Sequence, residues 1–415
     1  MNGNEKVIWY GTGEKVQTLF ESIQGLLNYI KYFVDEHHAG ETIMGRRVES
    51  PDMIFPSVRP IIVSVAEDRA QERIGCLIKK FRINTDQIWK AGEWIADILA
   101  SDPGVALLPE KVRLEACTIC QLECSSCYMR KSNYGVVGKG YLRFSDFKKF
   151  VDENDFVKKI ELSNNGEVFL NPDLSDILKY GYEKGLEFTM SNGVNFNSVR
   201  EDILEKLVLY QVKRITISID GASQRVYSLY RVNGDYDTVI NNIRKLNHYK
   251  NKYGSLYPEL VWQYILMDHN EAEVEEAKRI AREFGINIIY KLDWAGYFKP
   301  NNPAKLEKIT GISTFNRVDW KEHYGKKYTS GMCRQLLLTP QINYDGRLLG
   351  CCGVYLDDWN INVFEHGLKG SLNHGEYFQM LLDFMKGKYN PRLDIVCQKC
   401  SARMHSAGER QILEL

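Results

Sequence analysis

Four cysteines lie within the stretch CTICQLECSSCYMR, which runs from Cys117 to Arg130. Three of them follow the spacing Cys120-x3-Cys124-x2-Cys127, directly after the segment RLEACT, which we expect to be a strand. Three thiolates this close together can bind three irons of a cubane [4Fe–4S] cluster and leave the fourth iron open to another ligand. A zinc knuckle or a redox pair is the alternative, but both are usually built from C-x2-C pairs. The spacing therefore favours an iron–sulfur cluster on this loop.

A second group of cysteines lies near the C-terminus and comprises Cys333, Cys351, Cys352, Cys397 and Cys400. Four thiolates enclose a metal site completely, as they do in a structural zinc site. We predict a metal centre on Cys333, Cys351, Cys397 and Cys400, with Cys352 as a competitor for the place of Cys351. Zinc is the simpler alternative to iron at this site.

Two cysteines fall outside these sets. Cys117 stands three residues before Cys120 and is either a small packed residue or a thiol that donates hydrogen to a substrate radical. Cys76 is most simply a core residue.

The overall composition supports reading the cysteines as metal ligands. The 415 residues suggest two or three domains, and 54 basic residues balance 54 acidic ones, so neither a nucleic acid nor a membrane is an expected partner. The N-terminal residues do not resemble a signal peptide, and no apolar run is long enough to cross a bilayer. We therefore expect a cytoplasmic protein, in which thiols stay reduced.

The elements that must position the cysteine loop form a regular alternation of strands and helices. Expected strands lie at 113–118, 159–164, 187–192, 214–220, 260–266 and 286–292, and expected helices at 173–184, 198–210, 236–251 and 270–284. Such repetition predicts a parallel sheet with right-handed crossovers, here a partial (β/α)6 TIM-like barrel in the α/β class. Ligands of such sheets bind at the carboxyl ends of the strands, where the cysteine loop also falls.

Four regions are expected along the chain. Residues 1–100 read as a small Rossmann-like α/β domain, 101–112 as a linker, 113–300 as the partial barrel, and 301–415 as a cysteine-rich extension in which QINYDGRLLGCC predicts a hairpin with an Asp-Gly turn. The N-terminal YGTGEKV has Gly11 and Gly13, but Val16 stands where a third glycine would complete a dinucleotide fingerprint. That domain is expected either to bind a nucleotide-type group at a helix N-terminus or only to dock on the barrel.

The cysteine loop and several later motifs resemble those of the radical SAM superfamily. SNNGEV, with Asn165, Gly166 and Glu167, is similar to the family's GGE motif, although Asn165 replaces its first glycine. SNG, with Ser191 and Asn192, then ISIDG, with Ser218, and YRVNGDYD, with Arg231, follow in the family's order. The resemblance implies that Glu167 holds the amino group of S-adenosylmethionine (SAM) and that Arg231 lies near its carboxylate. It also implies that Ser191 and Asn192 lie near the methionine and ribose, and that Tyr128 contacts the adenine.

The C-terminal cysteines resemble a twitch/SPASM extension, which binds auxiliary clusters. Full SPASM domains carry more downstream cysteines than this chain has after Cys400. The resemblance therefore implies one auxiliary [4Fe–4S] cluster, and the spacing from Gly346 favours Cys351 over Cys352.

The implied reaction starts with reductive cleavage of SAM to a 5′-deoxyadenosyl radical, which abstracts a substrate hydrogen. We expect a small polyol or nucleotide-linked sugar as substrate, dehydrogenation as the reaction, and an external one-electron reductant of the flavodoxin or ferredoxin type. Lys291 and Asp293 are the expected bases, and Gln263, Tyr264 and Trp294 are further substrate contacts. Alternatives are modification of a ribosomal peptide, epimerisation with Cys117 as the hydrogen donor, and a zinc-stabilised non-catalytic binding protein.

Overall fold

The computed structural model of the protein describes residues 6–54, 60–63, 67–89, 91–127, 129, 134–292, 298–324, 335–351 and 359–388. Packing divides the chain into two compact units. The N-terminal unit comprises Met1–Glu110, Thr329–Pro340 and His366–Leu415, and the barrel unit comprises Lys111–Tyr328 and Gln341–Glu365. The four regions expected from the motifs stay a prediction, since these units follow packing alone.

The barrel unit is built on a seven-stranded parallel sheet with the order β14-β13-β12-β11-β10-β9-β15. Its strands are β9 (Lys111–Leu114), β10 (Lys159–Glu161), β11 (Glu187–Val194), β12 (Arg214–Ser218), β13 (Glu259–Leu266), β14 (Asn287–Leu292) and β15 (Gln341–Ile342). The first six lie side by side in chain order, which is the arrangement of a partial barrel. Nearly every residue of β12 and β13 is buried, because a parallel sheet is covered on both faces. The predicted fold class is thus confirmed.

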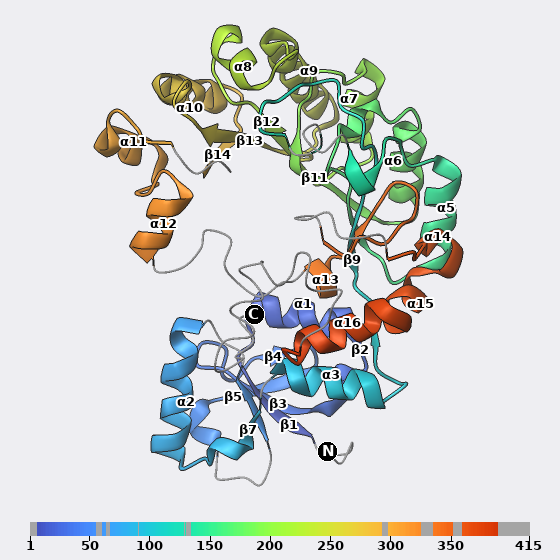
Figure 1. Ribbon diagram of the computed structural model, residues 1–415, viewed down its shortest axis with the longest axis vertical. Helices are drawn as coiled ribbons and strands as arrows, with labels where there is room; N and C mark the ends of the chain where they lie inside the picture. Colours follow the sequence, from blue (N-terminus) through green and yellow to red (C-terminus); the bar gives the residue numbers. More distant parts are fainter. Residues whose placement is uncertain are drawn as a thin grey trace. The chain divides into compact units, whose positions relative to one another are not determined.

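Helices connect these strands and follow one another along the outside of the sheet (Figure 1). They are α5 (Phe144–Glu153), α6 (Leu174–Glu183), α7 (Glu201–Leu209), α8 (Gln224–Tyr230), α9 (Tyr236–Tyr253) and α10 (Val274–Glu283), followed by α11 (Pro303–Thr310) and α12 (Arg317–Tyr324). Short 3-10 turns lie at Gly135–Val137, Val168–Leu170 and Glu271–Glu273. Local sequence sets the ends of α9: Asp235 accepts a hydrogen bond from the Thr238 amide, and Gly254 adopts the left-handed conformation after the last turn.

The predicted hairpin around Asp345 and Gly346 is confirmed. The amide of Asn343 donates to the carbonyl of Arg347, and Gly346 has a φ of +87°, a conformation that favours glycine. The first arm of this hairpin, β15, also pairs in parallel with β9. The hairpin therefore extends the barrel sheet beyond its first strand. Helix α14 (Val363–His366) follows shortly after it.

The N-terminal unit is built on a second, mostly parallel sheet with the order β4-β5-β3-β1-β6-β7. Its strands are β1 (Val7–Tyr10), β3 (Ile30–Val34), β4 (Thr42–Ile43), β5 (Arg46–Glu49), β6 (Ile61–Val63) and β7 (Ile88–Trp89). The chain leaves β1 toward β3 and β5, and then returns to the other side of β1 through β6 and β7. This reversal is the topology of a doubly wound, Rossmann-like sheet.

Helices and the C-terminal segments complete the N-terminal unit. Its helices are α1 (Glu14–Ser22), α2 (Glu67–Phe81), α3 (Ala91–Ser101), α13 (Gln335–Leu338), α15 (Leu368–Asn373) and α16 (Gly375–Met385). Short 3-10 turns lie at Leu26–Tyr29, Pro51–Met53 and Thr85–Gln87. Strand β2 (Ile23–Gln24) pairs in antiparallel fashion with β8 (Ala106–Leu107). Helices α3 and α16 pack closely, because Gly92 has no Cβ to collide with the carbonyl of Met385. Lys386 and Asp97 add an ion pair of 2.6 Å.

The described part of the chain contains no helix that is both long and apolar enough to span a membrane.

Candidate active site

The predicted cluster cysteines lie on the loop that follows β9, at the carboxyl edge of the barrel sheet. Cys124 is buried, and Cys120 and Cys127 are half-buried. An apolar group surrounds them, formed by Leu122, Tyr230, Ile265 and Met267. Burial, and after it the negative charges of Glu167, Cys124 and Cys127, raise the pKa of the Cys120 thiol to about 12. The three sulfurs are thus close enough to influence one another, and a bound cation would be needed to keep Cys120 as a thiolate.

The cysteine loop fits the iron–sulfur cluster that its spacing predicts. Among the described residues, no three Cys, His, Asp or Glu side chains converge as ligands of one metal ion. A [4Fe–4S] cluster does not require such convergence, because each thiolate binds a different iron. The three sulfurs share one buried, mainly apolar surface, which is the environment that such a cluster occupies.

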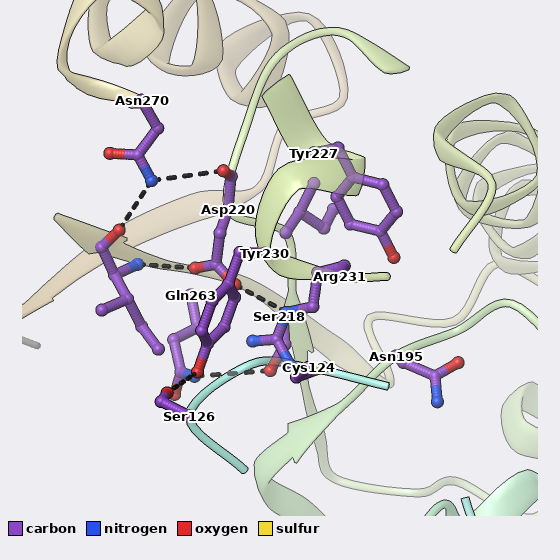
Figure 2. A network of polar contacts seen from close by, with 12 residues as sticks. Cys124, Ser126, Asn195, Ser218, Asp220, Tyr227, Tyr230, Arg231, Gln263 and Asn270 are labelled. Atoms are coloured by element: carbon purple, nitrogen blue, oxygen red, sulfur yellow. Dashed lines mark hydrogen bonds and ion pairs between the residues drawn. The ribbon is translucent and has the colours of Figure 1, made fainter. Parts of the chain in front are cut away.

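Arg231 is a charged side chain of the predicted site that contacts one of these thiols. Its guanidinium lies between Cys124 and the buried Asp220, as Figure 2 shows. Nη1 donates to Cys124 Sγ at 3.5 Å, and Nε donates to Asp220 Oδ2 at 2.6 Å. The other Asp220 oxygen accepts from the Ile265 amide at 2.7 Å, so the carboxylate also ties β13 to the end of β12.

Cys120 has neutral polar neighbours instead. Asn195 Nδ2 lies 3.7 Å from Cys120 Sγ and 3.3 Å from Gln121 Oε1. Gln121 Nε2 in turn donates to Asn195 Oδ1 and to Ser198 Oγ. This network joins the cysteine loop to the loop after β11.

The segment Asn164–Glu167 passes very close to the cysteine loop. A Cβ at Gly166 would overlap the carbonyl of Cys117, so only glycine fits there. Glu167 is buried and accepts from the Asn195 amide at 2.7 Å. Burial raises the pKa of Glu167 to about 7. Its carboxylate can therefore gain or lose a proton near neutral pH.

Asn165, which replaces the first glycine of the family motif, has a defined partner. Its amide and its Nδ2 both donate to Glu115 Oε2, at 2.9 and 3.0 Å. Glu115 is buried, and burial raises its pKa to about 8. The substitution therefore adds a side-chain hydrogen bond that anchors the loop carrying Gly166 and Glu167.

Ser191, Asn192 and Ser218 lie on the neighbouring strands. The amide of Ser191 donates to both carboxylate oxygens of Glu161, at 2.8 and 3.0 Å, and the Asn192 amide donates to Ser163 Oγ. Ser218 Oγ accepts from Gln263 Nε2 at 3.3 Å. The structure thus brings the three residues to the same edge as Glu167 and Arg231.

The expected substrate residues divide by the face of the sheet on which they lie. Ile265 packs against the cysteine loop. Gln263 lies on the same face of the sheet as Ile265, because side chains alternate along a strand. Lys291 also lies on this face, because it pairs with Ile265 across the two strands. Gln263 Oε1 is buried without a hydrogen-bond partner among the described residues. Burial lowers the pKa of Lys291. Tyr264 instead donates to the carbonyl of Asn270 and packs on Tyr290, which is a structural role.

Of the remaining predicted site residues, the structure describes Cys117 and Cys351 but not the others. Cys117 is fully buried, its thiol donates to the carbonyl of Ile119 at 3.7 Å, and burial raises its pKa to about 12. Cys351 is half-buried and follows the hairpin, with its amide bonded to the carbonyl of Leu349. Outside the described residues lie Tyr128, Asp293, Trp294, Cys333, Cys352, Cys397 and Cys400.

Three residues that position the site were not predicted: Glu115, Glu161 and Asn195. Glu115 directly follows β9 and Glu161 ends β10, and an acid at the carboxyl end of a predicted parallel strand is the sequence signal that could have revealed them. Asn195 gave no such signal, because its role depends on loops that meet only in the folded protein.

Part of this chain is similar to known proteins. Residues 114–281 match the Radical SAM superfamily. The AdoMet-dependent heme synthase of Methanosarcina barkeri is 31% identical over 124 residues, which are 30% of this chain and about a third (34%) of that protein. The probable GTP 3′,8-cyclase of Methanocaldococcus jannaschii is 25% identical over 236 residues, covering 51% of this chain and 72% of that protein.

A solved structure supports the fold over a larger share of the chain. SuiB of Streptococcus suis bound to S-adenosylmethionine superposes with a TM-score of 0.52 at 14% identity, covering 84% of this chain and 87% of SuiB. At this identity the likeness concerns the fold alone. Residues 114–281 thus form a domain of the radical SAM superfamily.

Proposed function

We propose that this protein is a radical SAM enzyme that oxidises a small polyol or a nucleotide-linked sugar. The observation that carries the radical SAM part is the meeting of Cys120, Cys124, Glu167 and Arg231 at the carboxyl edge of one sequential parallel sheet. When bound, a reduced [4Fe–4S] cluster and SAM supply a 5′-deoxyadenosyl radical that abstracts a hydrogen atom from carbon. The protein's task is to hold, orient and shield these groups.

The chain offers a complementary charge for each end of an amino acid. The Glu167 carboxylate suits the ammonium group of SAM, and the Arg231 guanidinium suits its carboxylate. Ser191, Asn192 and Ser218 offer hydroxyl and amide groups for the ribose, and we assign Tyr128 to the adenine by its place after Cys127. Buried apolar side chains such as Ile265 and Met267 exclude water from this edge.

Lys291 is the proposed base for the substrate hydroxyl, with Asp293 as its alternative. Lys291 lies on the face of the sheet that packs against the cysteine loop, and burial lowers its pKa toward the range in which an amine accepts a proton at neutral pH. Gln263 lies on the same face, and its unpartnered buried Oε1 can accept a hydrogen bond from a hydroxyl group. An amine base beside a carbonyl acceptor suits a substrate rich in hydroxyl groups.

The N-terminal unit favours a sugar-type substrate over a peptide. Its parallel doubly wound sheet is the fold of nucleotide- and sugar-handling domains, and peptide-recognising winged helices are built differently. We also propose that Cys333, Cys351, Cys397 and Cys400 would hold one auxiliary [4Fe–4S] cluster, which would accept the electron that remains on the substrate after hydrogen abstraction and deprotonation. A flavodoxin or ferredoxin would supply the electron for SAM cleavage. Determination of the iron and zinc content of the protein distinguishes an auxiliary iron–sulfur cluster from a zinc ion at these cysteines.

Deuterium transfer tests the proposed substrate class. The anaerobically reconstituted protein is incubated with SAM, dithionite and pools of polyols, sugars or nucleotide sugars deuterated at their carbinol carbons. We expect 5′-deoxyadenosine to gain one mass unit with at least one pool, and Lys291→Met to keep SAM cleavage but form no oxidised product. Gain of deuterium only from labelled peptides would replace the sugar assignment by peptide modification. A protein that holds zinc without iron and forms no 5′-deoxyadenosine would be a non-catalytic binding protein.

A further inference from the structure

Arg231 contacts Cys124, a predicted cluster ligand, and is also expected to lie near the carboxylate of SAM. Arg231 caps the C-terminal end of α8, and its side chain is only 13% exposed. Its Nη1 lies 3.5 Å from Cys124 Sγ, within hydrogen-bonding distance of a sulfur acceptor. A cation that donates to a ligand sulfur acts on the cluster whether or not SAM is present.

Two neighbours, Asp220 and Tyr230, hold the guanidinium in this place. Asp220, which is fully buried, accepts from Arg231 Nε at 2.6 Å, and its own backbone carbonyl accepts from Asn270 Nδ2. The ring of Tyr230 lies 4.9 Å from the guanidinium carbon. The Tyr230 hydroxyl is 2.6 Å from Ser126 Oγ on the cysteine loop, so the stacked ring is itself tied to that loop. Figure 2 shows Asp220, Tyr230 and Cys124 around Arg231.

The guanidinium stays charged in this environment. Burial alone would disfavour its positive charge, but the negative partners, Asp220 first and Cys124 next, outweigh that effect and raise the pKa of Arg231 above its ordinary value. Cys120 differs, because its sulfur contacts the uncharged Asn195 amide and no cationic side chain of the described residues is among the groups that act on it. The two cluster ligands therefore lie in unlike electrostatic surroundings.

We infer that Arg231 raises the reduction potential of the SAM-binding cluster by donating to Cys124 Sγ, with Asp220 as the positioning residue that aims it. This inference rests on the proposed function, since it requires a cluster on Cys120, Cys124 and Cys127. Reduction adds one electron to the cluster from an external one-electron donor, and no bond forms or breaks in the protein. A fixed positive charge and a hydrogen bond at a ligand sulfur stabilise the added negative charge and make reduction easier.

A redox titration without SAM tests this inference and excludes any effect through the SAM carboxylate. The midpoint potential of the reduced cluster is followed by EPR in the wild type, in Arg231→Gln and in the matched control Arg225→Gln, each with Cys351, Cys397 and Cys400 replaced by alanine so that only the SAM-binding cluster is titrated. Arg225 lies on the same short helix, is exposed, and its loss removes the same formal charge. We expect the ratio of reduced to oxidised cluster at fixed potential to fall at least tenfold in Arg231→Gln, a shift of about 59 mV toward more negative values. Arg225→Gln should titrate as the wild type does.

Iron content separates failure of this inference from failure of the proposed function. A wild type that binds no cluster on the three cysteines would remove the proposed function itself. A wild type and an Arg231→Gln variant with equal iron and equal midpoints would overturn the role of Arg231 alone. If Arg231→Gln does not retain iron, Arg231→Lys decides: a lowered midpoint supports the aimed guanidinium, and an unchanged one contradicts it.

Discussion

The N-terminal sheet and the barrel sheet both place carboxylates just beyond the ends of parallel strands. After β3, Asp35 accepts from the amide and the hydroxyl of Thr12, which follows β1. After β9, Glu115 accepts from the amide of Asn165, which follows β10. In each case an acid on one strand holds the loop that leaves the neighbouring strand.

The two sheets differ in what the held loops carry. In the N-terminal unit the neighbouring polar groups pair among themselves: Tyr10 donates to Glu36, which also forms an ion pair with Arg73. In the barrel unit the held loops carry Glu167 and its neighbours, and these face the cysteine loop. Acids at strand ends therefore anchor loops in both sheets, and we propose that such anchoring builds a reaction centre only where the anchored loops bring thiols and charges together.

The largest effect should follow from removing the thiols themselves. Cys120→Ala, Cys124→Ala and Cys127→Ala combined should reduce SAM cleavage to background and remove about four irons per protein, since the cluster loses all its protein ligands. Product analysis by mass spectrometry and iron determination measure both effects. The matched control is Cys76→Ala in the N-terminal unit, which should leave both unchanged. Full SAM cleavage by the triple variant would contradict the assignment of the loop.

Acidification should affect the barrel site before it affects the N-terminal unit. The pKa of Glu167 is about 7, so below that pH the folded protein increasingly holds a neutral carboxyl that cannot pair with an ammonium group. SAM affinity should fall about tenfold per pH unit below pH 7. Isothermal titration of the reconstituted protein measures this dependence. Glu167→Gln should bind SAM weakly at every pH, and a wild-type affinity that does not change between pH 6 and 8 would argue against Glu167 as the ammonium partner.

The Asp35 carboxyl of the N-terminal unit should take up a proton only at a lower pH than Glu167. Burial by itself would raise its pKa, but hydrogen bonds from His37 and Thr12 outweigh that effect and leave the pKa below its ordinary value. A lowered pKa in the folded state stabilises the protein above the ordinary pKa, and that stability is lost as the pH falls through the folded value. Its contribution is therefore constant between pH 6 and 8, where Glu167 titrates.

Removing one anchoring acid from each sheet should separate stability from activity. Glu115→Ala and Asp35→Ala each leave backbone donors without an acceptor, which costs about 1–3 kcal/mol of folding free energy. Thermal unfolding should show both losses, yet only Glu115→Ala should also weaken SAM cleavage, because its loop carries Gly166 and Glu167. Glu115→Gln is the conservative control and should restore most of both properties. Equal SAM cleavage in the two alanine variants would contradict the claim that only the barrel sheet's anchoring acid supports the candidate active site.

The smallest effect is expected from Cys117. Its thiol is fully buried and bonded to a carbonyl, so Cys117→Ala should cost ~1 kcal/mol and leave SAM cleavage intact. Formation of the oxidised product should also be unchanged. Selective loss of product formation with normal SAM cleavage would support epimerisation, with Cys117 as the hydrogen donor.

Much of the barrel unit could be predicted because its signals are local. Alternating strands and helices of ordinary length indicate a parallel sheet, and three cysteines after the first strand mark its functional edge. The pairing of β15 with β9 could not be predicted, since a two-residue strand carries no periodicity. The acids at the strand ends were visible, but their partners depend on strand register.

Contacts between distant segments could not be predicted either. Arg231 and Cys124 are 107 positions apart, and their contact follows from the way α8 returns over the sheet. Resemblance to a family suggested a SAM carboxylate for Arg231, and only the folded arrangement shows the sulfur beside it. The departure at Asn165 likewise gained a physical explanation once Glu115 was found next to it.

The central claim is that the edge formed by the cysteine loop, Glu167 and Arg231 holds a cluster with one iron open to SAM. EPR spectra of the dithionite-reduced protein, recorded with and without SAM, test this most directly. To isolate this cluster, the spectra are recorded on a variant in which Cys351, Cys397 and Cys400 are replaced by alanine. We expect SAM to change the g values of the remaining signal, because it binds the open iron. A reduced [4Fe–4S] signal that is identical with and without saturating SAM would contradict the account.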